Sequence, residues 1–269
     1  MAQSNNNTLE MIFYAGGDLP KPEVNTSHLR LYGHNLCPFT TRARYTLAAK
    51  GIPFQQCMVD LHHKGQWHSA FNGGTVPILE TPQGDLIPET AIIMQYALES
   101  SPAGGIQLVP SDPVEAAKMR VKMEEFMKNL GPLLGVVLSC GNDVGKINAY
   151  KETMLPQLEQ MATEANGKFL LATDDITLYD IHCAPLMELI FLFEKGVYAD
   201  VDAILQIRTN APNWVAYMER FRAHPVIKPV RMNAKASQLH GARSRAWDPT
   251  QKCHLCLEVL EGVWPDEQD

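Results

Sequence analysis

Three consecutive segments between residues 28 and 61 constrain the fold more than any other feature of the sequence. HLRLY alternates apolar and polar residues as a strand does, CPFTTRARYTLAAKG holds good helix formers and ends at a glycine, and PFQQCMVDL returns to a strand pattern. This order predicts a β-α-β unit, in which the helix connects two parallel strands and packs on one face of the sheet.

The segments that follow extend this unit. TVPILE and LIPE flank the turn TPQGD, and the helix-like segment ETAIIMQYALES comes next. We therefore predict a hairpin and a further helix, and about four strands with two or three helices up to about residue 100.

The pattern becomes helical from residue 112 onward. Asp112 and Pro113 are typical of an N-cap and a first helical position, and apolar residues then recur at helical spacing to a bend expected at Gly131-Pro132. Further helices are expected at 149–165, 178–195 and 212–222. The expected organisation is an N-terminal extension (1–27), an α/β domain (28–104), an all-helical domain (112–240) and a C-terminal tail (241–269).

Composition narrows the classes of function. The net charge is −7 and the Lys and Arg residues are scattered, which argues against a nucleic-acid partner. The sequence has neither an apolar run long enough to cross a bilayer nor the pattern of a secretory leader, so we expect a cytoplasmic protein without stable membrane insertion. Six cysteines spread along a long chain suggest reduced thiols rather than a disulfide framework.

Cys37 stands at the turn between the first predicted strand and its helix. Open α/β folds bind ligands at this edge of the sheet, and Pro38 at the first helical position leaves Cys37 at the N-cap. The helix dipole and unpaired N–H groups favour an anion there, so we expect a thiolate nucleophile. Thr40 stands where a Cys-x-x-Cys motif has its second cysteine, so no internal disulfide can form. The alternative is a small buried apolar residue.

These motifs together resemble the omega class of cytosolic glutathione transferases. The resemblance covers about residues 28–230 and is carried by LCPFTTRARYTLAAKGI, DLHHKGQW, GGTVPILETPQGDLIPETAIIMQYAL, LVPSDP and ITLYD. It implies a thioredoxin-like α/β N-terminal domain, an all-α C-terminal domain, a homodimer and glutathione as cosubstrate.

The resemblance also implies which residues bind glutathione. Pro38 and Phe39 complete a Cys-Pro-Phe active site. Val76 precedes an expected cis-proline, Pro77, and its backbone would pair with the cysteinyl part of glutathione.

The two ends of the tripeptide are assigned in the same way. Glu89 would bind the γ-glutamyl ammonium, while Thr90 and the helix N-terminus would bind the carboxylate beside it. Lys64 would pair with the glycyl carboxylate. The alternatives are plain helix capping for Glu89 and Thr90 and a solvated surface lysine for Lys64.

The helical half offers a candidate pocket and a folding motif. Apolar residues on its first helix could line the acceptor pocket or simply form core, and they are Met123, Phe126, Met127 and Leu130. Thr177 and Asp180 have the spacing of an N-capping box.

Other clusters receive no catalytic role. Cys253 and Cys256 lack a second pair at zinc-binding spacing, so no metal is expected. Histidines in the first half are expected to face solvent, and they are His34, His62, His63 and His68.

We therefore expect a glutathione-dependent thiol transferase or reductase. Its substrates would be mixed disulfides, dehydroascorbate or glutathionyl ketone thioethers, and a second glutathione would release glutathionylated Cys37. The alternatives are a glutathione-dependent isomerase or dehalogenase, and a non-catalytic glutathione-binding protein similar to chloride intracellular channel proteins. The expected partners are glutathione, a small electrophilic or disulfide substrate and a second copy of the chain.

Overall fold

The structure, a computed structural model, describes residues 8–14, 19–61, 64–100, 102, 104–130, 144–192 and 199–232. The chain divides into two compact units. The first contains the chain up to Ile106 and also residues 225–232, and the second contains Gln107–His224. Several features singled out in the sequence lie outside the described residues: His62, His63, the bend at 131–132, Cys253, Cys256 and the tail at 241–269.

The first unit is a mixed sheet of five strands in the order β1-β3-β2-β4-β5. The strands are β1 (Thr8–Tyr14), β2 (Leu29–Gly33), β3 (Phe54–Val59), β4 (Ile78–Glu80) and β5 (Leu86–Pro88). β3 pairs in parallel with β1 and β2, whereas β4 pairs antiparallel with β2 and β5. The four strands and three helices expected between residues 28 and 100 are present, and β1 is an additional strand that forms within the segment expected to be an extension.

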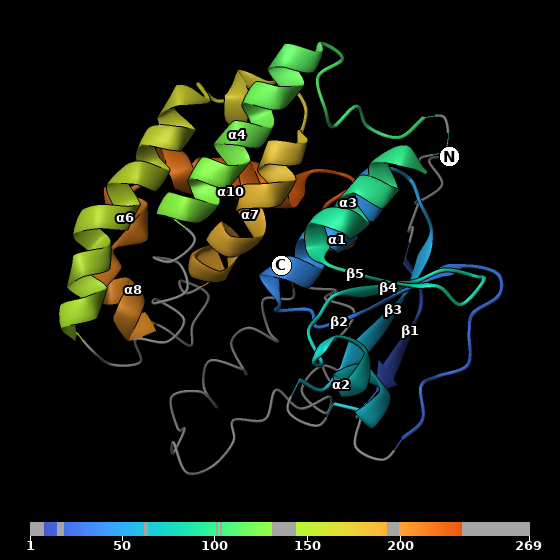
Figure 1. Cartoon of the computed structure of the whole chain (residues 1–269). Coiled ribbons are helices and arrows are strands. Elements are labelled where there is room, and N and C mark those ends of the chain that lie inside the picture. The colour runs from blue at the N-terminus through green and yellow to red at the C-terminus, as the bar shows by residue number, and fades with distance from the viewer. Residues whose placement is uncertain are drawn as a thin grey trace. The chain divides into compact units, whose positions relative to one another are not determined.

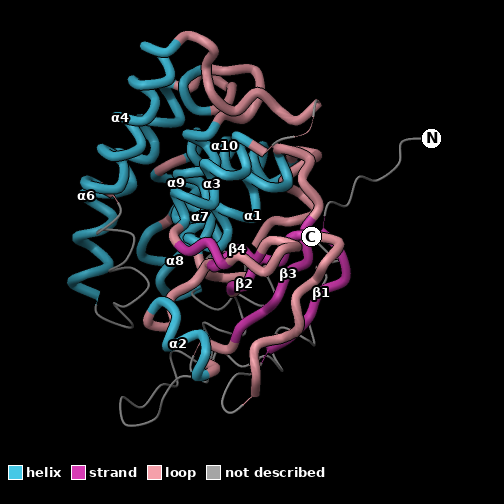
Figure 2. Tube along the Cα trace, turned by 45° about the vertical axis from the view of Figure 1, so that its right-hand side comes forward, coloured by secondary structure: helices cyan, strands magenta, loops and turns pink. Residues whose placement is uncertain are grey.

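Helices cover both faces of this sheet, as Figures 1 and 2 show. The helices are α1 (Pro38–Ala49), α2 (Gln66–Asn72) and α3 (Thr90–Glu99). Leu31 and Leu79 pack with side chains of α1 and α3, among them Leu47 and Ile93. The opposite face carries a second apolar cluster: Tyr14, Tyr32, Cys57, Val59 and Ile78, with Trp67 of α2 packed against it. The sheet is thus buried on both faces, as the thioredoxin-like fold requires.

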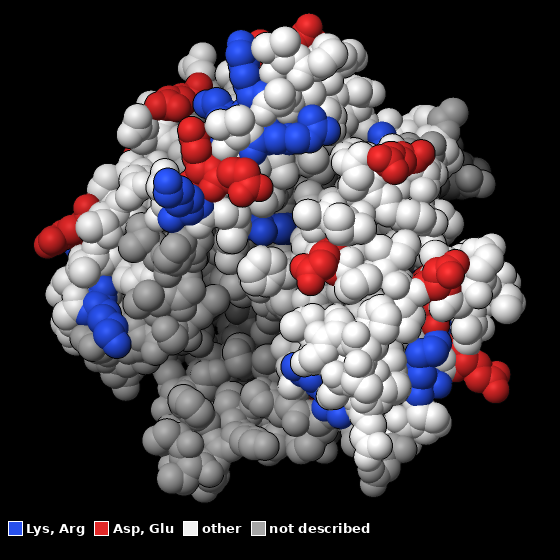
Figure 3. All heavy atoms as spheres, in the orientation of Figure 1, with Lys and Arg blue, Asp and Glu red and all other residues white. Residues whose placement is uncertain are grey.

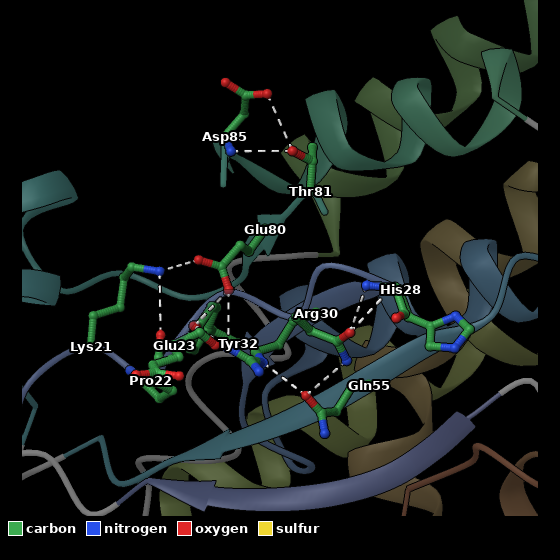
Figure 4. A network of polar contacts seen from close by, with 12 residues as sticks. Lys21, Pro22, Glu23, His28, Arg30, Tyr32, Gln55, Glu80, Thr81 and Asp85 are labelled. Atoms are coloured by element: carbon green, nitrogen blue, oxygen red, sulfur yellow. Dashed lines mark hydrogen bonds and ion pairs between the residues drawn. The ribbon is translucent and has the colours of Figure 1, made fainter. Parts of the chain in front are cut away.

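A buried carboxylate lies on the second face of the sheet (Figure 4). Glu80 is 1% exposed and accepts hydrogen bonds from the Arg30 guanidinium at 3.1 Å and the Tyr32 hydroxyl at 3.0 Å. The Lys21 ammonium forms a further ion pair with the same carboxylate. Arg30 in turn donates to the Glu23 carbonyl at 2.6 Å. A buried charge needs such partners, and here they fasten residues 21–23 to the sheet.

The second unit is helical. Its helices are α4 (Pro113–Asn129), α6 (Val144–Glu164), α7 (Leu178–Phe191), α8 (Ala199–Leu205), α9 (Ile207–Asn210) and α10 (Pro212–Ala223), with a 3-10 turn, η1, at Leu170–Ala172. The Asp112 side chain accepts from the Val114 and Glu115 N–H groups, both at 2.9 Å, so the predicted N-cap is confirmed. The predicted helices at 149–165, 178–195 and 212–222 correspond to α6, α7 and α10, and α6 begins five residues earlier than expected.

Charged side chains of both signs are distributed over the surface. Basic and acidic side chains are interspersed on the face that Figure 3 shows. Within the described ranges, no helix combines the length and the apolar composition that crossing a bilayer requires.

The capping box at the start of α7 is present. The Thr177 hydroxyl accepts from the Asp180 N–H, and the Asp180 carboxylate accepts from the Thr177 N–H at 2.8 Å. The same carboxylate also accepts from the Thr177 hydroxyl, the Leu170 N–H at 2.8 Å and the Tyr217 hydroxyl at 3.0 Å. Burial raises the pKa of Asp180 to about 6, whereas these hydrogen bonds favour the carboxylate. Asp180 therefore joins η1, α7 and α10.

Replacing Asp180 should destabilise the fold. Asp180→Asn places an amide against several donors, so we expect the free energy of unfolding to fall by about 3 kcal/mol, the order expected when buried donors lose their acceptors. Asp174→Ala is the control, because its pair with Lys168 is exposed and should contribute less than about 1 kcal/mol. Urea unfolding of both variants measures this, and equal losses would contradict a special role for Asp180.

Candidate functional site

The topology brings the candidate residues of the first unit to one edge of the sheet. Parallel β2 and β3 both end there, and antiparallel β4 begins there, because Tyr32 pairs with Ile78. β5 ends at the same edge, since Pro88 also pairs with Ile78. The turn that contains Cys37, the Val76-Pro77 bond and the start of α3 therefore lie close together.

Cys37 occupies the N-cap of α1, as predicted. Its backbone is extended, with φ of −79° and ψ of 115°, and Pro38 is the first helical residue. The side chain is half-buried, whereas Cys57 and Cys183, the other described cysteines, are buried. Burial raises the pKa of the Cys57 thiol to about 12, which keeps it protonated and unreactive. Among the described cysteines, only Cys37 combines access with the N-terminus of a helix.

The turn before Cys37 is closely packed. A Cβ atom at Gly33 would lie 2.2 Å from Thr40 Cγ2, so only glycine fits there. His34 Nδ1 accepts the Leu36 N–H at 3.1 Å, and the His34 carbonyl accepts the Cys37 N–H at 3.1 Å. His34 is fully buried, so the expectation that it faces solvent is wrong. It supports the turn from inside.

His68 supports the neighbouring loop in a similar way. It is fully buried, contrary to expectation, and its Nε2 atom lies 2.8 Å from the Thr75 carbonyl oxygen. The following Val76-Pro77 bond is cis, as the resemblance implies. Burial lowers the pKa of the His68 imidazole, the Thr75 hydrogen bond opposes this, and the nearby Lys64 ammonium lowers the pKa further.

Lys64 lies against the same loop. A Cβ atom at Gly74 would be 2.8 Å from Lys64 Cδ and 3.6 Å from its Nζ atom. The lysine side chain therefore crosses the backbone just before Val76. The structure thus brings Lys64 next to Gly74, two residues before Val76.

Glu89 and Thr90 begin α3 as predicted. Glu89 is exposed and has φ of 71° and ψ of 121°, a conformation that costs about 1–3 kcal/mol and is found mainly where function requires it. The Thr90 hydroxyl donates to the Phe39 carbonyl at 3.4 Å. This contact joins the start of α3 to the Cys-Pro-Phe segment.

The second unit contains a groove of about 350 Å³ between α4 and α6, with Tyr179 of α7 in its lining. Of the four residues suggested for an acceptor pocket, Phe126 and Leu130 line it, whereas Met123 and Met127 do not. Polar side chains provide much of the remaining lining, including Lys122, Glu125, Gln157 and Gln160. Assignment of an acceptor pocket to these four residues stays a prediction.

Tyr14 was not among the site residues predicted from the sequence. It is 3% exposed and ends β1 at the same edge of the sheet, where its hydroxyl accepts the Trp67 Nε1–H at 2.9 Å. The run MIFY just before a Gly-Gly pair is typical of a strand and could have indicated β1. Among the described residues, no group of three His, Cys, Asp or Glu side chains could hold a metal ion.

Comparison with known proteins identifies relatives of this chain. Residues 36–100 match the family model "Glutathione S-transferase, N-terminal domain". Glutathione S-transferase omega-1 of Mus musculus is 34% identical over 222 residues, which cover 81% of this chain and 87% of that protein. Glutathione S-transferase omega-2 of Homo sapiens is 29% identical over 206 residues, which cover 74% and 82%.

Solved structures share the fold. The crystal structure of glutathione transferase Omega 3C from Trametes versicolor matches with a TM-score of 0.63 at 21% identity, over 87% of this chain and 99% of that chain.

His68 should make stability depend on pH. The pKa of His68 is lowered in the folded state. As the pH falls below about 6.5, the His68 imidazole is therefore protonated in the unfolded chain before it is protonated in the folded protein. The stabilisation is thus present above that pH and lost on acidification, by at most about 1.4 kcal/mol per pH unit. Urea denaturation at several pH values between about 7.5 and 5 measures this. As the pH falls, the free energy of unfolding should decline less for His68→Gln than for wild type, and equal declines would contradict a role of His68.

Proposed function

Because the chain belongs to the omega class of the glutathione transferase family, we propose that it is a glutathione-dependent thiol transferase with Cys37 as nucleophile. Glutathione is the cosubstrate of this family. The observation that carries the proposal is the half-buried Cys37 thiol at the N-terminus of α1, where the helix dipole and unpaired N–H groups stabilise an anion.

The reaction has two thiol-disulfide exchanges. The Cys37 thiolate attacks the glutathionyl sulfur of a mixed disulfide, a new S–S bond forms, and the substrate leaves as a thiolate that takes up a proton. A second glutathione thiolate then attacks the Cys37 adduct, which releases oxidised glutathione and regenerates the Cys37 thiolate. Thr40 supplies no second thiol, so the cosubstrate itself must complete the cycle.

Glutathione binds along the edge of the sheet in this proposal. The Val76 backbone pairs with its cysteinyl residue, and the rigid support of Thr75 by His68 keeps that backbone in position. The γ-glutamyl ammonium binds Glu89, and the adjacent carboxylate binds Thr90 and the N–H groups at the start of α3. The Lys64 ammonium, next to the same loop, binds the glycyl carboxylate.

The proposal also covers substrates, assembly and domain limits, beyond the glutathione-binding residues. The same proposal includes the reduction of dehydroascorbate and of glutathionyl ketone thioethers. It also includes a homodimer, a cytoplasmic location and an acceptor pocket lined by Met123, Phe126, Met127 and Leu130. So are the domain limits at 28–104 and 112–240. A panel of these acceptors, together with substrates for isomerase and dehalogenase activity, distinguishes the transferase from the alternatives.

Cys37 should form a single adduct with oxidised glutathione. We expect mass spectrometry to find one glutathionyl group on Cys37 in wild type and none at position 37 in Cys37→Ser, with Cys57 and Cys183 unmodified because both are buried. Cys57→Ala is the control and should be modified like wild type. Modification mapped only to Cys253 or Cys256 would refute Cys37 as the nucleophile.

Glu89 should contribute to affinity through its charge. Glu89→Gln removes the partner of the γ-glutamyl ammonium, so we expect calorimetry to show glutathione binding weakened about tenfold or more. Glu99→Gln, at the other end of α3, changes an exposed carboxylate that accepts a hydrogen bond from Gln95, so it should leave affinity within about twofold. Equal affinities of wild type and Glu89→Gln would exclude this ion pair.

A further inference from the structure

Tyr14 contacts both ends of the loop 60–65, which connects β3 to α2. At the start of the loop, the Asp60 N–H donates to the Tyr14 carbonyl at 3.0 Å. Just after the loop, in α2, the Trp67 Nε1–H donates to the Tyr14 hydroxyl at 2.9 Å, and that hydroxyl donates to the Leu19 carbonyl at 2.9 Å. One residue of an edge strand thus holds the two stems of the loop on which Lys64 lies.

Gly65 fits this contact through its lack of a side chain. Its φ of −60° and ψ of 149° suit any residue, so its backbone conformation does not require glycine. A Cβ atom there, however, would lie 1.9 Å from the Tyr14 hydroxyl oxygen. Space for the tyrosine hydroxyl therefore accounts for glycine directly after Lys64.

The indole of Trp67 transmits this restraint into α2. Its ring contacts the edge of Tyr32 at 5.3 Å between centroids and stacks on His68 at 5.2 Å. The indole therefore lies among three aromatic rings, and its N–H is directed at Tyr14. Burial raises the pKa of Tyr14, so the phenol stays neutral and keeps its proton for the Leu19 carbonyl.

We propose that Tyr14 is a positioning residue for glutathione, because its contacts at Asp60, Gly65 and Trp67 hold the chain beside Lys64 and thereby keep this lysine where the glycyl carboxylate binds. Strand β1 is then part of the binding site rather than an accessory edge strand. This rests on the proposed function, which assigns the glycyl carboxylate to Lys64. A lysine held in position before binding loses less conformational entropy when glutathione arrives.

The test compares two ligands by titration calorimetry with the full-length protein. Glutathione contains the glycyl residue, and γ-glutamylcysteine lacks it. Tyr14→Phe removes both hydrogen bonds of the Tyr14 hydroxyl. We expect it to weaken glutathione binding about fivefold and to change γ-glutamylcysteine binding by less than about twofold. The proposal therefore requires that the loss of affinity depend on the glycyl group. A general loss of stability would weaken the binding of both ligands.

Two further variants complete the test. Gly65→Ala should give the same selective loss, because its methyl group would displace the Tyr14 hydroxyl. Tyr45→Phe is the matched control: this buried hydroxyl accepts the Met232 N–H at 3.1 Å, outside the loop 60–65, and its removal should change neither affinity.

The outcomes separate this proposal from the proposed function. If wild type binds both ligands equally well, Lys64 does not bind the glycyl carboxylate. The proposed role of Lys64 and the positioning role of Tyr14 then both fail. If wild type prefers glutathione, and Tyr14→Phe and Gly65→Ala keep that preference unchanged, only the role of Tyr14 is overturned. Equal weakening of both ligands by the two variants would likewise overturn it.

Discussion

The pairing of β2 with β4 is the constraint on which the arrangement of the first unit depends. In this register Leu31 lies opposite Leu79, on the apolar face covered by α1 and α3. Arg30 lies opposite Glu80, and their side chains form an ion pair on the other face. A slip by one residue would turn the Glu80 carboxylate toward the apolar core. The apolar cluster and the buried charges therefore select the same register.

This register also determines what the edge of the sheet can bind. It aligns the end of β2 with the start of β4, so the N-terminus of α1 faces an irregular segment at Val76-Pro77. In the proposed site, part of the glutathione binding is assigned to backbone groups, whose positions depend on buried neighbours. His34 and His68 act there as supports: each accepts or shares a hydrogen bond with a loop that carries a candidate binding group.

Short-range features were predictable from the sequence. The N-caps at Cys37 and Asp112 and the capping box at Thr177 were predicted correctly, since each depends on residues within one helical turn. The cis bond before Pro77 followed from resemblance rather than from spacing. Strand β1 was missed because its pairing partner, β3, begins 40 or more residues later. The solvent exposure expected for His34 and His68 was wrong because burial depends on packing between distant segments.

The sequence by itself determined the β-α-β unit, the position of Cys37 at the start of a helix and the helical character of the second half, because periodicity and capping act over neighbouring residues. Only the tertiary structure decided that Tyr14 contacts both Asp60 and Trp67, that Glu80 is buried with Arg30 and Tyr32, and that Lys64 lies beside Gly74. These contacts join segments far apart in the chain, and they form only once strand order and register have brought those segments together.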